Sequence, residues 1–286
     1  MLTLRAGDAT VELAPETGGS IARFHWRDRP VMRDPWPEAP PGPRGLACYP
    51  MVPFSNRIAR RRFTWGGVTH RLPALLAGHA IHGAGWQQAW EARRIGESEA
   101  ELSLSHQPGP LWPFAFHATQ HFSLDPDGLS VEFAIRNEHE APAPAGFGLH
   151  PFFPREPGMT LTFAAPHVWL NEEPEKVPLF RIATPPEWDH SRGLPVGQVL
   201  NECFAGWEGQ ARLQYPTHAV TIEADPLFRH LVVFVPEGQH FLAVEPVTNM
   251  NDGLNRMGGG VEHNVFVLAP GATRRGRVRF GVEMTA

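Results

Sequence analysis

The stretch LSVEFAI, residues 129–135, alternates apolar and polar side chains with a period of two. In an extended chain its leucine, valine, phenylalanine and isoleucine face one side, and its serine and glutamate face the other. The stretch RVRFGVEM, residues 277–284, repeats this pattern near the end of the chain. Such alternation is typical of strands that bury one face and expose the other. The sequence therefore predicts antiparallel β structure in both places.

The rest of the chain has the same character. The turn signal DPDG (125–128) directly precedes the first stretch, and 28 glycines and 30 prolines punctuate short segments throughout. The runs LVVFV (231–235) and NVFVLAP (264–270) are uniformly apolar, as expected of central strands in a packed sandwich. Helical periodicity is weak. We therefore predict an all-β fold, a single large antiparallel β-sandwich domain over residues 1–286, with a proline-rich surface loop at 34–45.

Composition excludes several classes of partner. The formal net charge of −5 argues against nucleic acid, which would require a basic face. No run of about 18 apolar residues occurs, so we expect no membrane span. The N-terminal stretch lacks a basic region leading into an apolar one, which predicts a cytoplasmic protein. Two cysteines, Cys48 and Cys203, are too few for a disulfide framework and lack zinc-binding spacing; we expect both to be small buried residues.

Two titratable residues stand in apolar surroundings. His150 lies in GFGLHPFF (146–153), either as a core histidine bonded to a backbone carbonyl or as a general acid or base in an apolar cleft. Glu245 follows the apolar run FLAV and precedes a proline. Because burial of a carboxylate is costly, Glu245 either forms a salt bridge with an arginine or acts as a general base.

A second group of polar residues lies in the first third of the chain. Asn56 and Arg57 stand between apolar neighbours and offer donors and an acceptor suited to sugar hydroxyls or a carboxylate. The arginine run that follows, 60–62, is typical of a solvated loop or edge strand.

The spacing of two histidines raises the question of a metal site. His79 and His82 lie three residues apart, which would suit a metal on a helix, but the surrounding glycines argue against a helix. We therefore predict no metal here. His82, next to a glycine, can instead approach a ligand closely, and Trp86 is either a core residue or a wall of the same cleft.

Several motifs follow one another along the chain: NRIARRRFTWGG, AIHGAGWQQAW, WPFAFHATQHFSL running to AGFGLHPFF, NECFAGWEG, FLAVEPVTN and VFVLAPGATRRGRVRF. In their order and spacing, over roughly residues 10–283, the sequence resembles the aldose 1-epimerase (galactose mutarotase) family. The resemblance implies a galactose mutarotase-like supersandwich, a small-molecule sugar in an open cleft, isomerase activity, and neither metal nor cofactor.

The resemblance assigns roles to individual residues. The general base of the family falls on Glu245, its general acid on His150 and its second active-site histidine on His82. The pair that contacts sugar hydroxyls falls on Asn56 and Arg57. Histidine has an ordinary pKa near neutrality, and desolvation would raise the pKa of the glutamate toward the same range.

One position departs from the family pattern. The family usually has an aspartate at the start of the NECFAGW-like motif, where it holds sugar hydroxyls. Here the residue is Asn201, followed by Glu202. We expect Asn201 to contact the sugar and to alter the preference between aldoses.

Three alternatives differ in chemistry. A hexose 6-phosphate mutarotase would need a cationic patch at the rim of the cleft, for which Arg60, Arg61 and Arg62 are candidates. A typical glycosidase needs two carboxylates across the scissile bond, and Glu245 is the one well-framed carboxylate. A non-catalytic sugar-binding protein would need no acid–base pair. The sequence leaves open whether the protein is a monomer or a homodimer.

Overall fold

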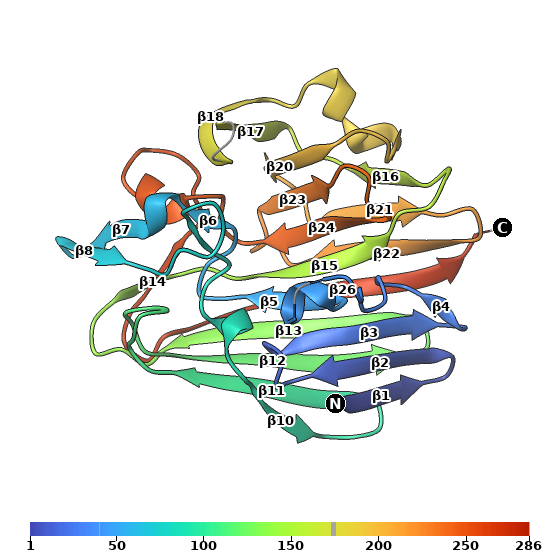
Figure 1. Cartoon of the computed structure of the whole chain (residues 1–286), viewed down its shortest axis with the longest axis horizontal. Helices are drawn as coiled ribbons and strands as arrows, with labels where there is room; N and C mark the ends of the chain where they lie inside the picture. The colour runs from blue at the N-terminus through green and yellow to red at the C-terminus, as the bar shows by residue number, and fades with distance from the viewer. Residues whose placement is uncertain (40, 173–175, 286) are drawn as a thin grey trace.

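Residues 1–39, 41–172 and 176–285 are described by a computed structural model, in which strands dominate and the helices are single 3-10 turns (Figure 1). These residues form two large antiparallel sheets, which confirms the predicted β-sandwich. None of their helices is long and apolar enough to cross a bilayer. The short turns are η1 (Pro43–Gly45), η2 (Ala59–Arg61), η3 (Gly85–Gln87), η4 (Pro186–Trp188), η5 (His190–Arg192) and η6 (Gly253–Arg256).

Within the described residues the first sheet has eleven strands. Its order is β1 (Leu2–Ala6), β2 (Ala9–Ala14), β3 (Ser20–Trp26), β5 (Cys48–Met51), β15 (Gly148–Pro154), β24 (Phe241–Val247), β23 (His230–Val235), β20 (Leu200–Ala205), β17 (His167–Glu172) and β18 (Val177–Ala183), with β4 (Arg29–Pro30) beside β3.

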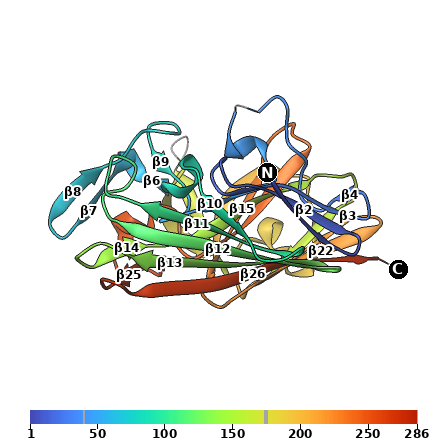
Figure 2. The same cartoon turned by 90° about the horizontal axis from the view of Figure 1, so that it is seen from below.

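The second sheet has nine strands in the same part of the chain and forms the lower layer in Figure 2. Its order is β10 (Glu91–Arg94), β11 (Glu99–His106), β12 (Phe116–Asp125), β13 (Gly128–Asn137), β26 (Thr273–Met284), β22 (His218–Ala224), β21 (Gln210–Gln214), β16 (Thr160–Phe163) and β19 (Leu194–Pro195). Three two-stranded ladders lie beside the sheets: β6 (Arg57–Ile58) with β9 (Ala80–Ile81), β7 (Arg62–Trp65) with β8 (Val68–Arg71), and β14 (Ala143–Ala145) with β25 (Phe266–Leu268).

The two alternating stretches of sequence are partners in the second sheet. β13 and β26 pair directly, with Leu129 opposite Phe280 and Val131 opposite Val278. These four side chains are buried between the sheets, whereas Glu132 on the other face is exposed. Each such burial contributes about 1.5–3 kcal/mol. The DPDG turn joins β12 to β13 as predicted.

The central strands of the first sheet are buried on both faces. On β24, Leu242 and Val244 belong to the core between the sheets, while Phe241 and Ala243 belong to a second apolar cluster on the opposite face. The run LVVFV is likewise the interior strand β23, as predicted. Because both faces are covered, these strands are uniformly apolar.

The prediction for NVFVLAP was wrong. Its strand, β25, pairs with β14 outside both large sheets, and Val267 is 53% exposed. Phe266 and Leu268, two residues apart, pack on the core, so the strand covers the core with a single face. The cysteines are buried and free, as expected, and the described part of 34–45 is a loop that contains η1.

Candidate active site

The predicted site residues meet in one cavity of about 250 Å³ on the face of the first sheet that is turned away from the core. They are far apart in sequence and come from β6, β15, β20, β24 and the segments next to β6 and β9. The cavity is lined by all six: Asn56, Arg57, His82, His150, Asn201 and Glu245.

Strand register brings the proposed acid and base together. β15 and β24 are antiparallel neighbours, and Gly148 lies opposite Val247. His150 lies two residues after Gly148, and Glu245 lies two residues before Val247. The two side chains are therefore opposite each other on one face of the sheet. Nε2 of His150 lies 3.2 Å from Oε1 of Glu245. The two strands are otherwise apolar, and their pairing places one imidazole opposite one carboxyl group.

Burial controls the protonation of this pair. His150 is 6% exposed and Glu245 is 2% exposed. Desolvation raises the pKa of Glu245 well above its usual range, as the sequence predicted. Desolvation also lowers the pKa of His150 to about 3, whereas an ordinary value was expected. Both shifts favour the neutral forms, in which the Glu245 carboxyl group is protonated and the His150 imidazole is uncharged.

His82 is fixed by the backbone beside β6. Its Nδ1 accepts a hydrogen bond from the Asn56 amide at 3.2 Å, and its own amide donates to the Asn56 carbonyl at 2.9 Å. Because Nδ1 is an acceptor, neutral His82 carries its proton on Nε2. Burial lowers the pKa of His82 well below its usual value, which keeps the ring neutral. The ring can therefore donate one hydrogen bond to a ligand.

The glycine after His82 serves the backbone rather than the ligand. Gly83 has a φ of 76°, and a Cβ there would stand 2.1 Å from the Val52 carbonyl oxygen. That oxygen accepts hydrogen bonds from the amides of Ala84 and Gly85, at 2.8 and 2.9 Å. From the sequence we expected this glycine to let a ligand approach His82. In the structure it instead lets two backbone segments approach each other.

His79 and His82, which are close in sequence, line different hollows of the structure. His79 does not line the cavity; its Nδ1 accepts a hydrogen bond from the Arg60 amide at 3.0 Å. It lines a separate hollow of about 1000 Å³, together with the arginines 60–62. In the part of the chain that the structure describes, no three His, Cys, Asp or Glu side chains gather as a metal site.

An aromatic wall stands beside the pair. Tyr49 lies opposite His150 on β5, and their rings stack with centroids 4.6 Å apart. Tyr49 also stacks on Trp86 at 5.6 Å, and both line the cavity. The sequence analysis left Trp86 open and missed Tyr49, since the contact depends on the pairing of β5 with β15. Desolvation raises the pKa of Tyr49, so its hydroxyl stays protonated.

Two further polar residues hold the site in place. Asn249, just beyond β24, accepts a hydrogen bond from the Ser55 amide at 3.2 Å, which anchors the segment before Asn56. It closes the FLAVEPVTN motif but was not singled out from the sequence. Asn171 donates to both the Asn201 carbonyl and the Glu202 carboxylate, at 2.9 Å each. Asn201, not Glu202, lines the cavity.

Comparison with known proteins agrees with this architecture. A family model described as aldose 1-epimerase matches residues 1–281. The chain belongs to the aldose 1-epimerase family. Within it, the chain is 30% identical to the uncharacterized protein YphB of Escherichia coli K12, with 98% of each chain covered.

Solved structures of similar proteins share the fold. A proposed aldose 1-epimerase of Escherichia coli K12 superposes with a TM-score of 0.89 at 28% identity, covering 99% of this chain and 98% of its own. A galactose mutarotase-like protein of Clostridium acetobutylicum gives a TM-score of 0.87 at 16% identity, covering 99% and 95%. The supersandwich expected of the aldose 1-epimerase family is therefore confirmed.

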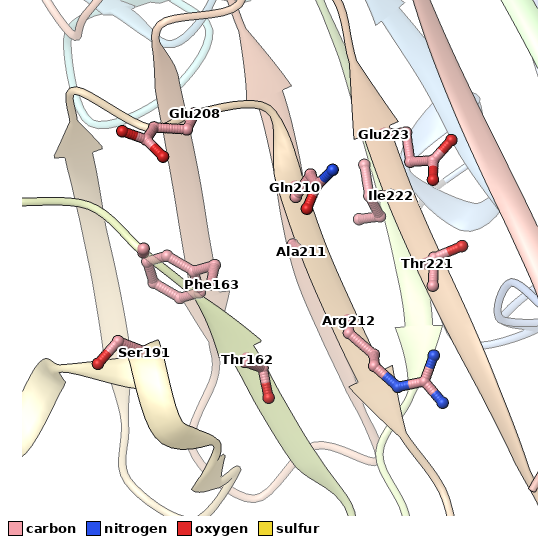
Figure 3. A pocket seen from close by; sticks show the side chains of 11 residues that line it. Thr162, Phe163, Ser191, Glu208, Gln210, Ala211, Arg212, Thr221, Ile222 and Glu223 are labelled. Atoms are coloured by element: carbon pink, nitrogen blue, oxygen red, sulfur yellow. The ribbon is translucent and has the colours of Figure 1, made fainter.

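This family member has another hollow, on the second sheet. A groove of about 510 Å³ lies over β16, β21 and β22, lined by Thr162, Gln210, Arg212, Glu223 and others (Figure 3). Glu208 and Glu223 are exposed at its sides, and Arg212 is paired with Glu283 at 2.6 Å. The groove lacks a buried titratable pair among these side chains, so the cavity at His150 is the candidate active site.

Proposed function

We propose that the protein is an aldose 1-epimerase, an isomerase that interconverts the α and β anomers of an aldose by acid–base ring opening and closure. The observation that carries this proposal is the buried pair of His150 and Glu245, 3.2 Å apart in a cavity of about 250 Å³. Neutral His82, Asn56, Arg57 and Asn201 surround it with groups that bond hydroxyls.

The reaction uses the one proton of the pair. In the reactive form this proton is on His150 and Glu245 is ionised. Glu245 takes the proton of the anomeric hydroxyl while His150 gives its proton to the ring oxygen. The bond between C1 and the ring oxygen breaks, and an open-chain aldehyde forms. Ring opening thus leaves both side chains in the neutral forms that burial favours.

Closure completes the anomer exchange. After rotation about C1–C2, the ring oxygen attacks the other face of the aldehyde, gives its proton back to His150, and the carbonyl oxygen takes the proton from Glu245. Each positioned proton transfer is typically worth about 10²–10⁴-fold in rate. No bond to the protein forms, and no electrons are exchanged with a cofactor.

The test is mutarotation by the purified protein. Polarimetry of freshly dissolved α-D-glucose and α-D-galactose should show relaxation faster than in buffer, and the rate should survive exhaustive chelation. His150 should contribute no inflection near pH 6.5 to the pH profile, because burial lowers its pKa to about 3. Failure to accelerate any aldose would instead support a sugar-binding protein, and zinc-restored activity after chelation would contradict the metal-free mechanism.

A further inference from the structure

Tyr49 contacts the face of the His150 imidazole from the neighbouring strand. The two residues are opposite each other where β5 pairs with β15. Their rings stack with centroids 4.6 Å apart and an angle of 26° between the ring planes. Tyr49 also stacks on Trp86, whose Nε1 donates a hydrogen bond to the Ile81 carbonyl at 3.2 Å. Strand pairing and the anchored Trp86 therefore both fix the plane of the Tyr49 ring against the imidazole.

A protonated His150 has few partners for its charge. Its Nε2 lies 3.2 Å from the Glu245 carboxyl group, whereas its buried Nδ1 has no hydrogen-bond partner among the described residues. Desolvation lowers the pKa of His150, and the positive charges of Arg33 and Arg44 lower it further. Stabilisation of the charged imidazole therefore has to come from Glu245 at the edge of the ring and from the groups that pack against its faces.

The other titratable groups near His150 do not supply negative charge. The His82 ring stands perpendicular to the imidazole with centroids 5.2 Å apart, and burial keeps it neutral by lowering its pKa. Burial also raises the pKa of the Cys48 thiol, which precedes Tyr49 on β5. Arg57 lines the same cavity and adds a positive charge that acts on Glu245 and His82.

Phe152 is the second carbocyclic ring beside His150, and it differs from Tyr49 in its surroundings. Its ring is tilted by 40° against the imidazole, with centroids 4.6 Å apart. The guanidinium carbon of Arg33 stands over Phe152 at 4.1 Å, so this ring already faces a cation. In the described part of the chain, the arginines that stack on rings lie over residues other than Tyr49. Tyr49 is therefore the ring whose face is turned to the imidazole and not to an arginine.

We propose that Tyr49 is a positioning residue for the acid–base step, in which its ring face stabilises the positive charge that His150 carries in the reactive form. The face of an aromatic ring is negative and attracts a cation, most strongly where water is excluded. Tyr49 thereby increases the share of the pair in which His150 is protonated and Glu245 is ionised. This inference rests on the proposed function and adds a residue that acts through His150. Tyr49 itself exchanges no proton, because burial raises the pKa of its hydroxyl.

The experiment changes the electron density of the ring while nearly preserving its size. Tyr49→Phe is followed, at the same position, by mono-, di- and trifluorinated phenylalanine, since each fluorine withdraws electrons from the ring face. Tyr49→Phe should keep kcat for mutarotation within about threefold. Across the fluorinated series kcat should then fall stepwise, by about tenfold in total, with KM less affected. Polarimetry at saturating α-D-glucose and α-D-galactose measures kcat, and circular dichroism checks folding.

Two further proteins complete the set. Tyr49→Leu removes the ring and should lower kcat at least as far as the most fluorinated phenylalanine. Phe163 provides the matched control, because its ring stacks on the buried His190 with centroids 4.8 Å apart and an angle of 18°. This stack does not line the cavity. The same fluorinated phenylalanines at position 163 should leave kcat unchanged.

The outcomes separate this inference from the epimerase proposal. If kcat does not depend on fluorination at position 49, or if Tyr49→Phe loses as much activity as Tyr49→Leu, Tyr49 acts through its shape or its hydroxyl. The inference is then wrong and the epimerase proposal stands. A fall in kcat on fluorination at position 163 would also overturn the inference, since the effect would not be specific to His150. If the parent protein accelerates no aldose, the epimerase proposal fails and this inference fails with it.

Discussion

The cavity around His150 and the groove around Arg212 contain similar functional groups in different surroundings. Both have a glutamate, an arginine and an amide side chain, and the groove, at about 510 Å³, is larger than the cavity at about 250 Å³. In the groove Glu223 is exposed and Arg212 forms a surface ion pair with Glu283 (Figure 3). In the cavity Glu245 is 2% exposed and faces an imidazole.

The difference follows from which sheet face each region occupies. The groove lies on an outward face whose alternate residues are polar, so water solvates each charge. The cavity lies over largely apolar strands, in which His150 and Glu245 form a polar pair between β15 and β24. Desolvation there moves the pKa of both members of the pair. Burial, rather than volume or polarity, distinguishes the reactive region.

The largest expected effect comes from removing the pair. Glu245→Gln keeps the shape but loses the proton acceptor, and His150→Asn loses the titrating ring. Each should lower kcat for mutarotation by about 10²-fold or more. The double variant should be little worse than the worse single variant, because the two groups act as one unit. Polarimetry at saturating sugar measures kcat, and circular dichroism checks folding.

The groove provides the matched control for this experiment. Glu223→Gln makes the same substitution in the exposed region and should leave kcat unchanged. A folded Glu245→Gln or His150→Asn protein with near-normal kcat would return that residue to a purely structural role, and loss of activity in Glu223→Gln would remove the distinction between the two regions.

A second effect should appear in stability below pH 6.5. His82 and His230 are buried, and desolvation lowers the pKa of His82 well below normal and that of His230 to about 4. The unfolded chain binds a proton at each, with a pKa near 6.5, whereas the folded chain does not. Stability therefore falls as pH is lowered from 6.5 toward 4. The slope from these two groups is about 2.7 kcal/mol per pH unit.

The two members of the His150–Glu245 pair should oppose each other in that slope. The raised pKa of Glu245 lets the folded chain keep a proton that the unfolded chain releases, whereas the lowered pKa of His150 has the opposite effect. Urea denaturation at pH 7, 6 and 5 measures the slope, which His230→Gln should reduce by about 1.4 kcal/mol per pH unit. His240→Gln, at an exposed position, should leave it unchanged. If the free energy of unfolding has the same pH slope in the parent protein, His230→Gln and His240→Gln, the conclusion that His230 is buried and neutral is wrong.

Strands that expose one face were predicted from the sequence better than strands in uniformly apolar runs. Alternation in 129–135 and 277–284 identified strands of the second sheet because one face of each meets water. The uniformly apolar runs carried less information: 231–235 is a central strand, but 264–270 is not. A continuous apolar run therefore does not distinguish a strand that is covered on both faces from one that covers the core with a single face.

The site residues were predicted through the family resemblance, and its missing parts are those that depend on tertiary pairing. Tyr49 reaches the cavity through its register with His150. Arg44, in η1, also lines the cavity and reaches it through a loop that Arg33 holds by hydrogen bonds. Neither contact leaves a local pattern in the sequence. The low pKa of His150 could not be foreseen either, because it results from complete burial rather than from the identity of adjacent residues.

The smallest effect we expect concerns Asn201. This half-buried amide lines the cavity from β20 and can both donate and accept, whereas an aspartate accepts only. Asn201→Asp should shift the ratio of kcat/KM between galactose and glucose by about fivefold, the worth of one neutral hydrogen bond. Gln210→Glu, the corresponding amide-to-carboxylate change in the groove, should leave this ratio unchanged, since its side chain is exposed to water. An unchanged ratio in Asn201→Asp would mean that this amide lines the cavity without touching the sugar, and selectivity between epimers would then have to come from His82 or from Asn56 and Arg57.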